Sequence, residues 1–481
     1  MDIKKLKLTD AVLIVSGAMI GSGIFIVSAD MSRVIGGGGW LLLLWVISAI
    51  MTVFAALSYG ELAGMMPKAG GQYVYLKEAY NPLMGFLFGW TSFAVIQSGT
   101  IAAVAVAFAK FSGVLYKPFN EHHILFDFGW MQISAAQIVG IACLLVLTII
   151  NAGGLRYGKI INLFFNSSKL IALFGLIILG LFVFAKNDVW QLNLSTFWST
   201  KHMDYDSTNK VITGSSMLSG VALLSAMGFA LVGSLFSSDA WNNVTFIAAE
   251  VDNPKRNIPL SLLIGTLVVS VFYILANLAY LHLLPLNGQV NGIDETARGI
   301  QFATNDRVGV AAATVMFGNV ASIIMAILIM ISTFGCNNGI ILASVRVYQQ
   351  MAMDGLFFAK MKENNKNGVP GFALWVQFFW CAVLCLSGKY GDLLDFVMFS
   401  VMLFYILTIF GIFILRKKKP DAERPYKVWG YPILPAVYIL MAFAFCVNLL
   451  FTKTQNAGIG LLIVLLGLPI YFIWSKSKKT E

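Results

Sequence analysis

The chain has 481 residues, of which 58% are hydrophobic and 12% are charged, and its formal net charge is +10. A soluble domain usually has about 25% charged residues, so this composition excludes a soluble enzyme and a soluble nucleic-acid-binding protein. Apolar runs of some 20 residues recur along the whole length, and each can cross a hydrocarbon core of roughly 30 Å. We therefore expect an all-α, polytopic integral membrane protein.

The basic charge follows the topology, because Lys and Arg concentrate in alternate loops and at the N-terminus. The positive-inside rule then predicts that both termini are cytoplasmic. We expect the protein in the plasma membrane. The basic N-terminus is not followed by a small-residue cleavage site, so the first span is expected to be retained. The five cysteines lie in or beside predicted spans, and neither a disulfide framework, a metal nor a cofactor is expected.

The first predicted span, residues 11–35, is interrupted at its centre by Gly21, Ser22 and Gly23. Glycine costs about 1 kcal/mol in a helix interior relative to alanine and permits an opened turn. In hydrocarbon such a turn is tolerated only where it is buried in protein or lines a cavity. Its freed N–H groups can then hold an anion such as a substrate carboxylate. The alternative is that these small residues only allow close helix packing.

The next four spans are predicted at residues 40–66, 82–113, 133–151 and 160–184. The loop 114–130 contains His122 and His123, which we expect to face solvent. The long polar loop 186–216 is expected outside, as a surface cap without chemistry of its own.

The sixth span, residues 217–250, is longer than one crossing needs. Its centre is polar and reads Phe236-Ser237-Ser238-Asp239-Ala240-Trp241-Asn242-Asn243. A carboxylate at this depth is a functional-site candidate. The alternative is that Asp239 caps the second half of a broken helix.

Six further spans are predicted at residues 259–282, 308–350, 372–387, 393–415, 434–451 and 457–474, which brings the total to twelve. We expect a core of residues 1–415, with repeats at about 8–184 and 217–415. A basic cytoplasmic connection and two peripheral spans would fill residues 416–481. The breaks in spans one and six are five helices apart, so the two copies have opposite orientations. Broken helices at matching positions of inverted halves predict a transporter with a midplane binding site.

Several motifs resemble those of the amino acid–polyamine–organocation (APC) superfamily. They are Gly21-Ser22-Gly23-Ile24-Phe25, Pro67-x-x-Gly70-Gly71-x-Tyr73 and Trp241-Asn242-Asn243. Two more resemble its L-type amino acid transporter branch, namely Glu250-x-x-Asn253-Pro254-x-Arg256-Asn257-Ile258-Pro259 and Arg424-Pro425-Tyr426-Lys427-x-Trp429-Gly430-Tyr431-Pro432. The resemblance implies the leucine-transporter-type fold, a five-plus-five inverted repeat with discontinuous helices 1 and 6.

The resemblance also implies roles for residues at both breaks. The backbone of Ile20, Gly21, Ser22 and Gly23 would hold the substrate carboxylate. Carbonyls around Phe236, Ser237 and Asp239 would hold the α-amino group, and Phe236 would close over the substrate as a gate. Asp239 would either favour cationic side chains or only cap its half-helix.

Lys169 lies about nine residues into the fifth span, roughly 14 Å deep at 1.5 Å per residue, where its stem does not easily reach water. By resemblance, its ammonium group replaces a sodium ion near Gly17, Ser332 and Thr333. The alternative is a lysine at a wet helix end. We therefore expect sodium-independent transport.

These observations predict exchange of small or medium neutral L-amino acids, with proton-coupled symport as the alternative. A membrane enzyme would need clustered catalytic groups, yet the four histidines are scattered at or beyond helix ends. A channel would need a filter loop or charged ring, and nothing resembles one. Loop 114–130 lacks the cysteine that heavy-chain-linked relatives carry, so no disulfide-linked ancillary subunit is expected.

Overall fold

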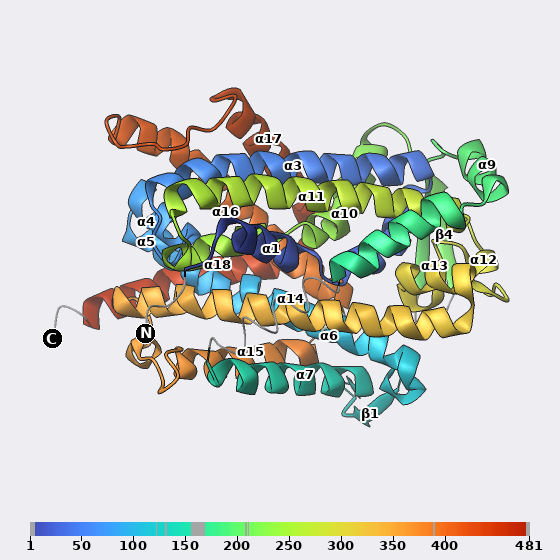
Figure 1. Ribbon diagram of the computed structural model, residues 1–481, viewed down its shortest axis with the longest axis horizontal. Coiled ribbons are helices and arrows are strands. Elements are labelled where there is room, and N and C mark those ends of the chain that lie inside the picture. Colours follow the sequence, from blue (N-terminus) through green and yellow to red (C-terminus); the bar gives the residue numbers. More distant parts are fainter. Residues whose placement is uncertain are drawn as a thin grey trace.

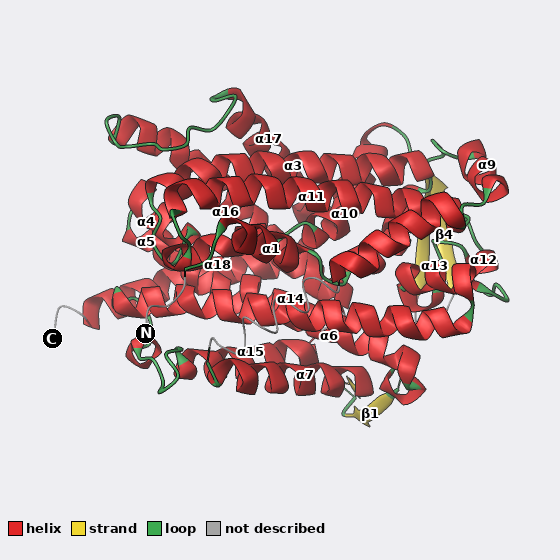
Figure 2. Cartoon of the chain, in the orientation of Figure 1, coloured by secondary structure: helices red, strands yellow, loops and turns green. Residues whose placement is uncertain are grey.

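The computed structural model describes residues 5–121, 123–129, 132–154, 169–206, 209, 211–387 and 390–477. Residues 160–168 of the predicted fifth span and His122 lie outside this part of the chain. The described chain is a bundle of long helices aligned roughly along one axis (Figure 1). Strands occur only in small hairpins at one end of the bundle (Figure 2).

Seventeen α-helices have bounds within the described residues. They are α1 Leu8–Met19, α2 Val27–Ile35, α3 Gly38–Met65, α4 Gln72–Ala79, α5 Pro82–Thr91, α6 Gln97–Leu115, α7 Ala135–Ala152, α9 Asn187–Ser195, α10 Gly220–Ser237, α11 Pro254–Leu283, α12 Glu295–Arg298, α13 Val308–Phe317, α14 Asn319–Met353, α15 Gly371–Ser387, α16 Tyr390–Lys418, α17 Ile433–Thr452 and α18 Thr454–Ser477.

Short 3-10 and π segments complete the helical structure. The 3-10 helices are η1 Gly23–Phe25, η3 Lys117–Phe119, η5 Trp241–Glu250, η6 Thr304–Asp306 and η7 Ala359–Lys362, and the π-helices are η2 Ser92–Ile96 and η4 Leu179–Val183. The strands are β1 Ile124–Asp127, β2 Gln132–Ser134, β3 Lys201–Asp206 and β4 Val211–Met217. They form two antiparallel pairs, β1 with β2 and β3 with β4.

Nine helical stretches of the described chain are long and apolar enough to cross a membrane. The helix Lys169–Val183 and α9 make a tenth if they count as one span, although they are bent by 93°. Three shorter apolar helices, α1, α13 and α15, add to these. The prediction of a multi-pass membrane protein is confirmed, and the count of twelve spans stays a prediction.

Local sequence sets several helix starts. Asn81 accepts a hydrogen bond from Met84 N at 3.0 Å and precedes Pro82, the first residue of α5. Proline suits this position because its missing N–H has no helical partner there. Ser134 and Gln137 form a capping box at the start of α7, which satisfies two N–H groups that the helix leaves open.

The core of the bundle is built on two helix pairs. Helices α3 and α11 pack along much of their length, as do α6 and α14 (Figure 1). The broken first span, α1 to α2, packs against α11, α14 and α10. Its interrupted centre is therefore enclosed by protein, as an opened turn in a membrane requires.

The structure corrects three element predictions. The predicted span 308–350 is two helices, because Gly318 at φ +76 separates α13 from α14. The sixth span does not begin at Met217, which ends β4, but at Gly220. The loop 186–216 contains α9 and most of the β3–β4 hairpin, so the all-α prediction holds for the spans and not for their connections. All five cysteines are free and buried.

Candidate substrate and coupling site

The first span is interrupted where the glycines predicted it. Helix α1 ends at Met19, and Ile20 has φ −75 and ψ 88, outside the helical region. The single turn η1 follows, and α2 begins at Val27. The residues of the interruption are buried, so its backbone groups need partners within the protein.

Two carbonyl groups of this interruption are held by residues predicted from the sequence. The Lys169 Nζ donates to the Gly17 carbonyl, and the Ser332 Oγ donates to the Ile20 carbonyl at 3.2 Å. Thr333 lies beside Ser332, but its hydroxyl donates to carbonyls of its own helix, α14. Lys169 is buried, and the structure thus places it on the first break and not at a wet helix end.

The two carbonyls between them are held by residues that the sequence analysis missed. The Cys336 Sγ donates to the Ala18 carbonyl at 3.1 Å, and the Tyr273 hydroxyl donates to the Met19 carbonyl at 2.9 Å. Four consecutive carbonyls, Gly17 to Ile20, are therefore each satisfied by a side chain from another helix. A helix C-terminus leaves its last four carbonyls without intrahelical partners. Here side chains from other helices act as the hydrogen-bond donors to these carbonyls.

The sixth span is broken as well. Helix α10 ends at Ser237, and Ala240 has a left-handed backbone with φ +63. The chain resumes in the 3-10 helix η5, a geometry that is poorer than an α-helix and is often found at functional positions. The Tyr273 hydroxyl also lies 3.1 Å from the Ser237 carbonyl, so one side chain contacts both breaks.

The two breaks touch each other. A β-carbon on Gly23 would lie 2.8 Å from Ser237 Cβ and would overlap its Oγ. A β-carbon on Gly21 would lie 3.4 Å from Cys336 Sγ. Phe236 is 7% exposed and lies beside the contact. The predicted residues of the two breaks, separated by more than 200 positions, therefore lie at one place in the bundle.

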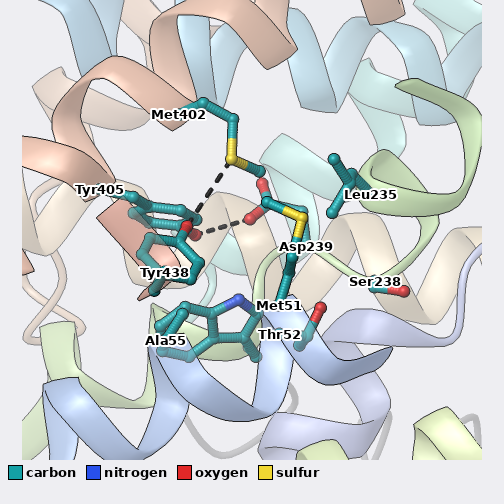
Figure 3. Close-up of a pocket in the computed structure, with 10 residues that line it drawn as sticks. Met51, Thr52, Ala55, Leu235, Ser238, Asp239, Met402, Tyr405 and Tyr438 are labelled. Atoms are coloured by element: carbon teal, nitrogen blue, oxygen red, sulfur yellow. Dashed lines mark hydrogen bonds between the residues drawn. The ribbon is translucent and has the colours of Figure 1, made fainter. Parts of the chain in front are cut away.

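A small buried cavity adjoins the second break (Figure 3). It is lined by residues of α3, α10, η5, α16 and α17 and of the break between α10 and η5, namely Met51, Thr52, Ala55, Leu235, Ser238, Asp239, Trp241, Met402, Tyr405 and Tyr438. The Asp239 carboxylate lies in it and accepts a hydrogen bond from the Tyr405 hydroxyl at 2.6 Å (Figure 3). The Tyr438 hydroxyl lies 3.6 Å from the Met402 sulfur.

This geometry gives the Asp239 carboxylate a partner outside η5, and its capping role stays a prediction. The residue at the N-cap position of η5 is Ala240, and no side-chain cap is formed there. The Asp239 side chain instead points at Tyr405 of α16. A tyrosine within a long apolar run, such as Tyr405 or Tyr438, gives little signal in a sequence, because aromatic residues are common in membrane helices.

Two facing breaks inside a bundle of membrane-length helices, with a cavity beside them that holds a buried carboxylate, define the class of a membrane transporter. The chain belongs to the amino acid permease family of the APC superfamily, because the model of that family matches residues 6–473. The superfamily predicted from the motifs is confirmed.

Curated relatives match this chain over nearly its whole length. The serine/threonine exchanger SteT of Bacillus subtilis (strain 168) is 28% identical over 478 residues, which cover 99% of this chain and 98% of that one. The human large neutral amino acids transporter small subunit 2 is 29% identical over 472 residues, or 98% and 80% of the two chains. The human cystine/glutamate transporter is 27% identical over 481 residues, or 99% and 87%. The chain is thus similar to amino acid transporters and exchangers.

Proposed function

We propose that this protein is a sodium-independent secondary transporter that exchanges small or medium neutral amino acids by alternating access. The observation that carries the proposal is the first break, where side-chain donors occupy four consecutive carbonyls and the Lys169 ammonium occupies that of Gly17. The family and the relatives support transport of amino acids. The proposed setting is the plasma membrane, with both termini cytoplasmic.

The substrate backbone would bind between the two breaks. The backbone of Ile20 to Gly23 would hold the substrate carboxylate, because the second half of the first span begins at Gly23 and a helix N-terminus favours a carboxylate. The Ile20 and Gly21 N–H groups donate here to the Ser16 and Met19 carbonyls, so they would exchange these partners for the carboxylate. Carbonyls around Phe236, Ser237 and Asp239 would accept hydrogen bonds from the α-amino group. Phe236, buried beside the contact of the two breaks, would close over the substrate.

Sodium independence is inferred from the partners of the carbonyls. A metal cation bound at the break would need several oxygen ligands at once. The Gly17 and Ile20 carbonyls and the Ser332 hydroxyl already bond within the protein. A fixed ammonium can supply the positive charge that a sodium ion would otherwise bring.

We place these parts in a five-plus-five inverted repeat of twelve spans. The two breaks, in α1–α2 and α10–η5, support it, because each lies in the first helix of its predicted repeat. Helices α17 and α18 follow the second repeat. Tyr438 of α17 lines the cavity, so this proposed peripheral helix would contribute to the wall around the substrate side chain.

Asp239 favours a second candidate function, the transport of amino acids with cationic side chains. Its carboxylate lies in the cavity beside the second break, together with the aromatic residues Trp241, Tyr405 and Tyr438. A carboxylate attracts an ammonium or guanidinium group directly, and aromatic faces attract cations as well. Neutral substrates would leave Asp239 paired to Tyr405, as it is here.

The test is uptake of a radiolabelled amino-acid panel into proteoliposomes without sodium, with empty vesicles compared with vesicles preloaded with unlabelled amino acid. Uptake only into preloaded vesicles is the expected result, and it identifies the substrates at the same time. Uptake into empty vesicles that grows with an inward proton gradient would replace exchange with proton symport. No uptake in either case, or a strict need for sodium, would overturn the proposal.

A further inference from the structure

The β3–β4 hairpin is fastened to α2, the second half of the broken first span. Gly36, just after α2, forms an isolated antiparallel bridge with Thr200, just before β3. The Arg33 guanidinium of α2 lies 5.1 Å from the ring centroid of Tyr205 in β3. His202, also in β3, reaches the carbonyl of Val34. Helix α2 and the hairpin therefore move together unless these contacts break.

His202 makes two contacts, and both partners only accept hydrogen bonds. Its Nδ1 lies 3.2 Å from the Val34 carbonyl, and its Nε2 lies 3.1 Å from Asp204 Oδ1. A carbonyl and an ionised carboxylate have no hydrogen to donate. Both contacts can be hydrogen bonds at the same time only when both ring nitrogens carry hydrogen, which is true of the imidazolium form alone. A neutral ring would face one of these oxygens with a lone pair.

The charged and titratable groups around this contact belong to four elements. They are Lys201, Asp204, Tyr205 and Asp206 of β3, Asp30 and Arg33 of α2, Asp306 of η6 and Lys110 of α6, whereas β4 has no charged residue. Asp306 is held by Arg33 at 2.8 Å and lies 3.6 Å from the Lys110 Nζ. Burial raises the pKa of Asp306, but the charges of Arg33 and Lys110 outweigh burial and leave that pKa below its ordinary value.

The ion pairs beside His202 therefore keep their charge down to pH values well below neutrality. Arg33 is a permanent cation, and it also donates to the Gln301 carbonyl at 2.5 Å. Among the described contacts that join α2 to the hairpin, the one made by His202 involves an imidazole, the type of side chain whose charge ordinarily changes in the physiological pH range.

We propose that His202 is a pH-sensitive clasp between the β3–β4 hairpin and α2, closed when its imidazole is protonated. The hairpin lies at the end of the molecule opposite α1's start and α18's end (Figure 1). At acidic pH on this side of the molecule, the contact of His202 with Val34 holds α2 against the hairpin. At neutral or alkaline pH this contact is lost. Because α2 is the half of the first span nearest this face, its release favours opening of the site toward it.

The clasp can be tested on the purified protein without a transport measurement. Hydrogen–deuterium exchange of peptides covering α2 and β3 is measured at about pH 5.5 and about pH 7.5, with correction for intrinsic exchange rates. The wild type should exchange several-fold faster at the higher pH. His202→Gln, which stays neutral, should exchange equally fast at both. Asp204→Asn should reduce the difference, because its amide can donate to a neutral imidazole as well as accept from a protonated one.

His123→Gln is the matched control, since His123 is an exposed histidine of the same end of the molecule, and it should keep the wild-type difference. Equal exchange at both pH values in the wild type, or an unchanged difference in His202→Gln, would overturn the proposal. Amino acid exchange at the same pH on both sides of the vesicle provides a second readout. The rate of exchange should rise with pH in the wild type and should not depend on pH in His202→Gln. Because the pH is equal on both sides, a proton gradient does not contribute.

Discussion

Gly23 and Ser237 are in direct contact, and this contact joins the two broken spans. A β-carbon on Gly23 would lie 2.8 Å from Ser237 Cβ and 3.1 Å from its Cα. Real β-carbon contacts are longer, so a side chain at position 23 would push the breaks apart. The glycine is needed here for close approach of two backbones, in addition to any freedom that it gives the opened turn.

Gly23→Ala should therefore reduce amino acid exchange roughly tenfold or more, since misplacement by about 1 Å is enough for effects of this size at a binding site. Uptake into preloaded proteoliposomes measures it. Gly339→Ala is the control, because a β-carbon on Gly339 meets nothing within 4 Å. If Gly23→Ala and Gly339→Ala lost exchange activity to the same extent, the contact between Gly23 and Ser237 would not be the cause.

Lys169→Ala should also reduce sodium-free exchange strongly. The substitution leaves the buried Gly17 carbonyl without its donor, and an unsatisfied buried polar group costs about 1–3 kcal/mol. Uptake is measured with and without sodium, and Lys186→Ala, at the N-cap of α9, is the control. Sodium-free uptake as fast as in the wild type would contradict the role proposed for Lys169.

The sequence predicted the breaks more fully than their surroundings. Gly21 to Gly23 and the polar run around Asp239 are local signals, so both interruptions could be located. Cys336 and Tyr273 contact the first break from 318 and 254 positions away. Such contacts depend on how each helix is rotated and packed. The sequence of an apolar run does not indicate which of its residues will face a particular neighbouring helix. Gly318 was missed for a related reason, because a single glycine inside an apolar stretch is compatible with a continuous helix.

Asp239→Asn should lower uptake of arginine and lysine relative to alanine by roughly tenfold or more, because the cavity then has no countercharge for a cationic side chain. Tyr405→Phe is the matched comparison. It removes the hydrogen bond to Asp239 but keeps the carboxylate, so relative uptake of cationic substrates should be retained. If the wild type takes up no cationic amino acid, or if Asp239→Asn keeps the wild-type ratio of arginine and lysine uptake to alanine uptake, then Asp239 does not recognise cationic side chains.

Glu61→Gln should destabilise the protein by roughly 3 kcal/mol, the size seen when one partner of a buried ion pair is removed. Glu61 is fully buried in α3 and accepts hydrogen bonds from Arg416 at 2.7 and 2.9 Å and from Val428 N at 2.8 Å. It thereby holds the basic connection between α16 and α17 against the core. The midpoint of thermal unfolding in detergent measures the loss.

A second carboxylate that pairs with a basic residue just after α16 provides the control for Glu61. Glu78 of α4 pairs with Lys419 at 2.8 Å, but both side chains are about half exposed. Surface pairs contribute about 0–1 kcal/mol, so Glu78→Gln should shift the unfolding midpoint little. Similar shifts in the two variants would mean that the burial of Glu61 does not determine its contribution.

Asp354 should make stability depend on pH in the acid range. It follows α14 and accepts hydrogen bonds from Lys77 Nζ at 2.6 Å and Tyr73 Oη at 2.7 Å, both on α4. Burial raises the pKa of Asp354, but the hydrogen bonds from Lys77 and Tyr73 outweigh burial and leave that pKa below its ordinary value. The folded state therefore binds the proton less readily than the unfolded state does.

A carboxyl group of this kind stabilises the fold above its ordinary pKa of about 4 and loses that contribution as the pH falls through its lower folded value. Asp354→Asn should thus be less stable than the wild type by about 1–2 kcal/mol near neutral pH, the size of hydrogen bonds to a charged group. The difference in unfolding midpoint should stay constant down to about pH 5 and shrink below about pH 4. A difference that instead grew with acid would mean that the protonated form of Asp354 is the one that holds α4 to α14.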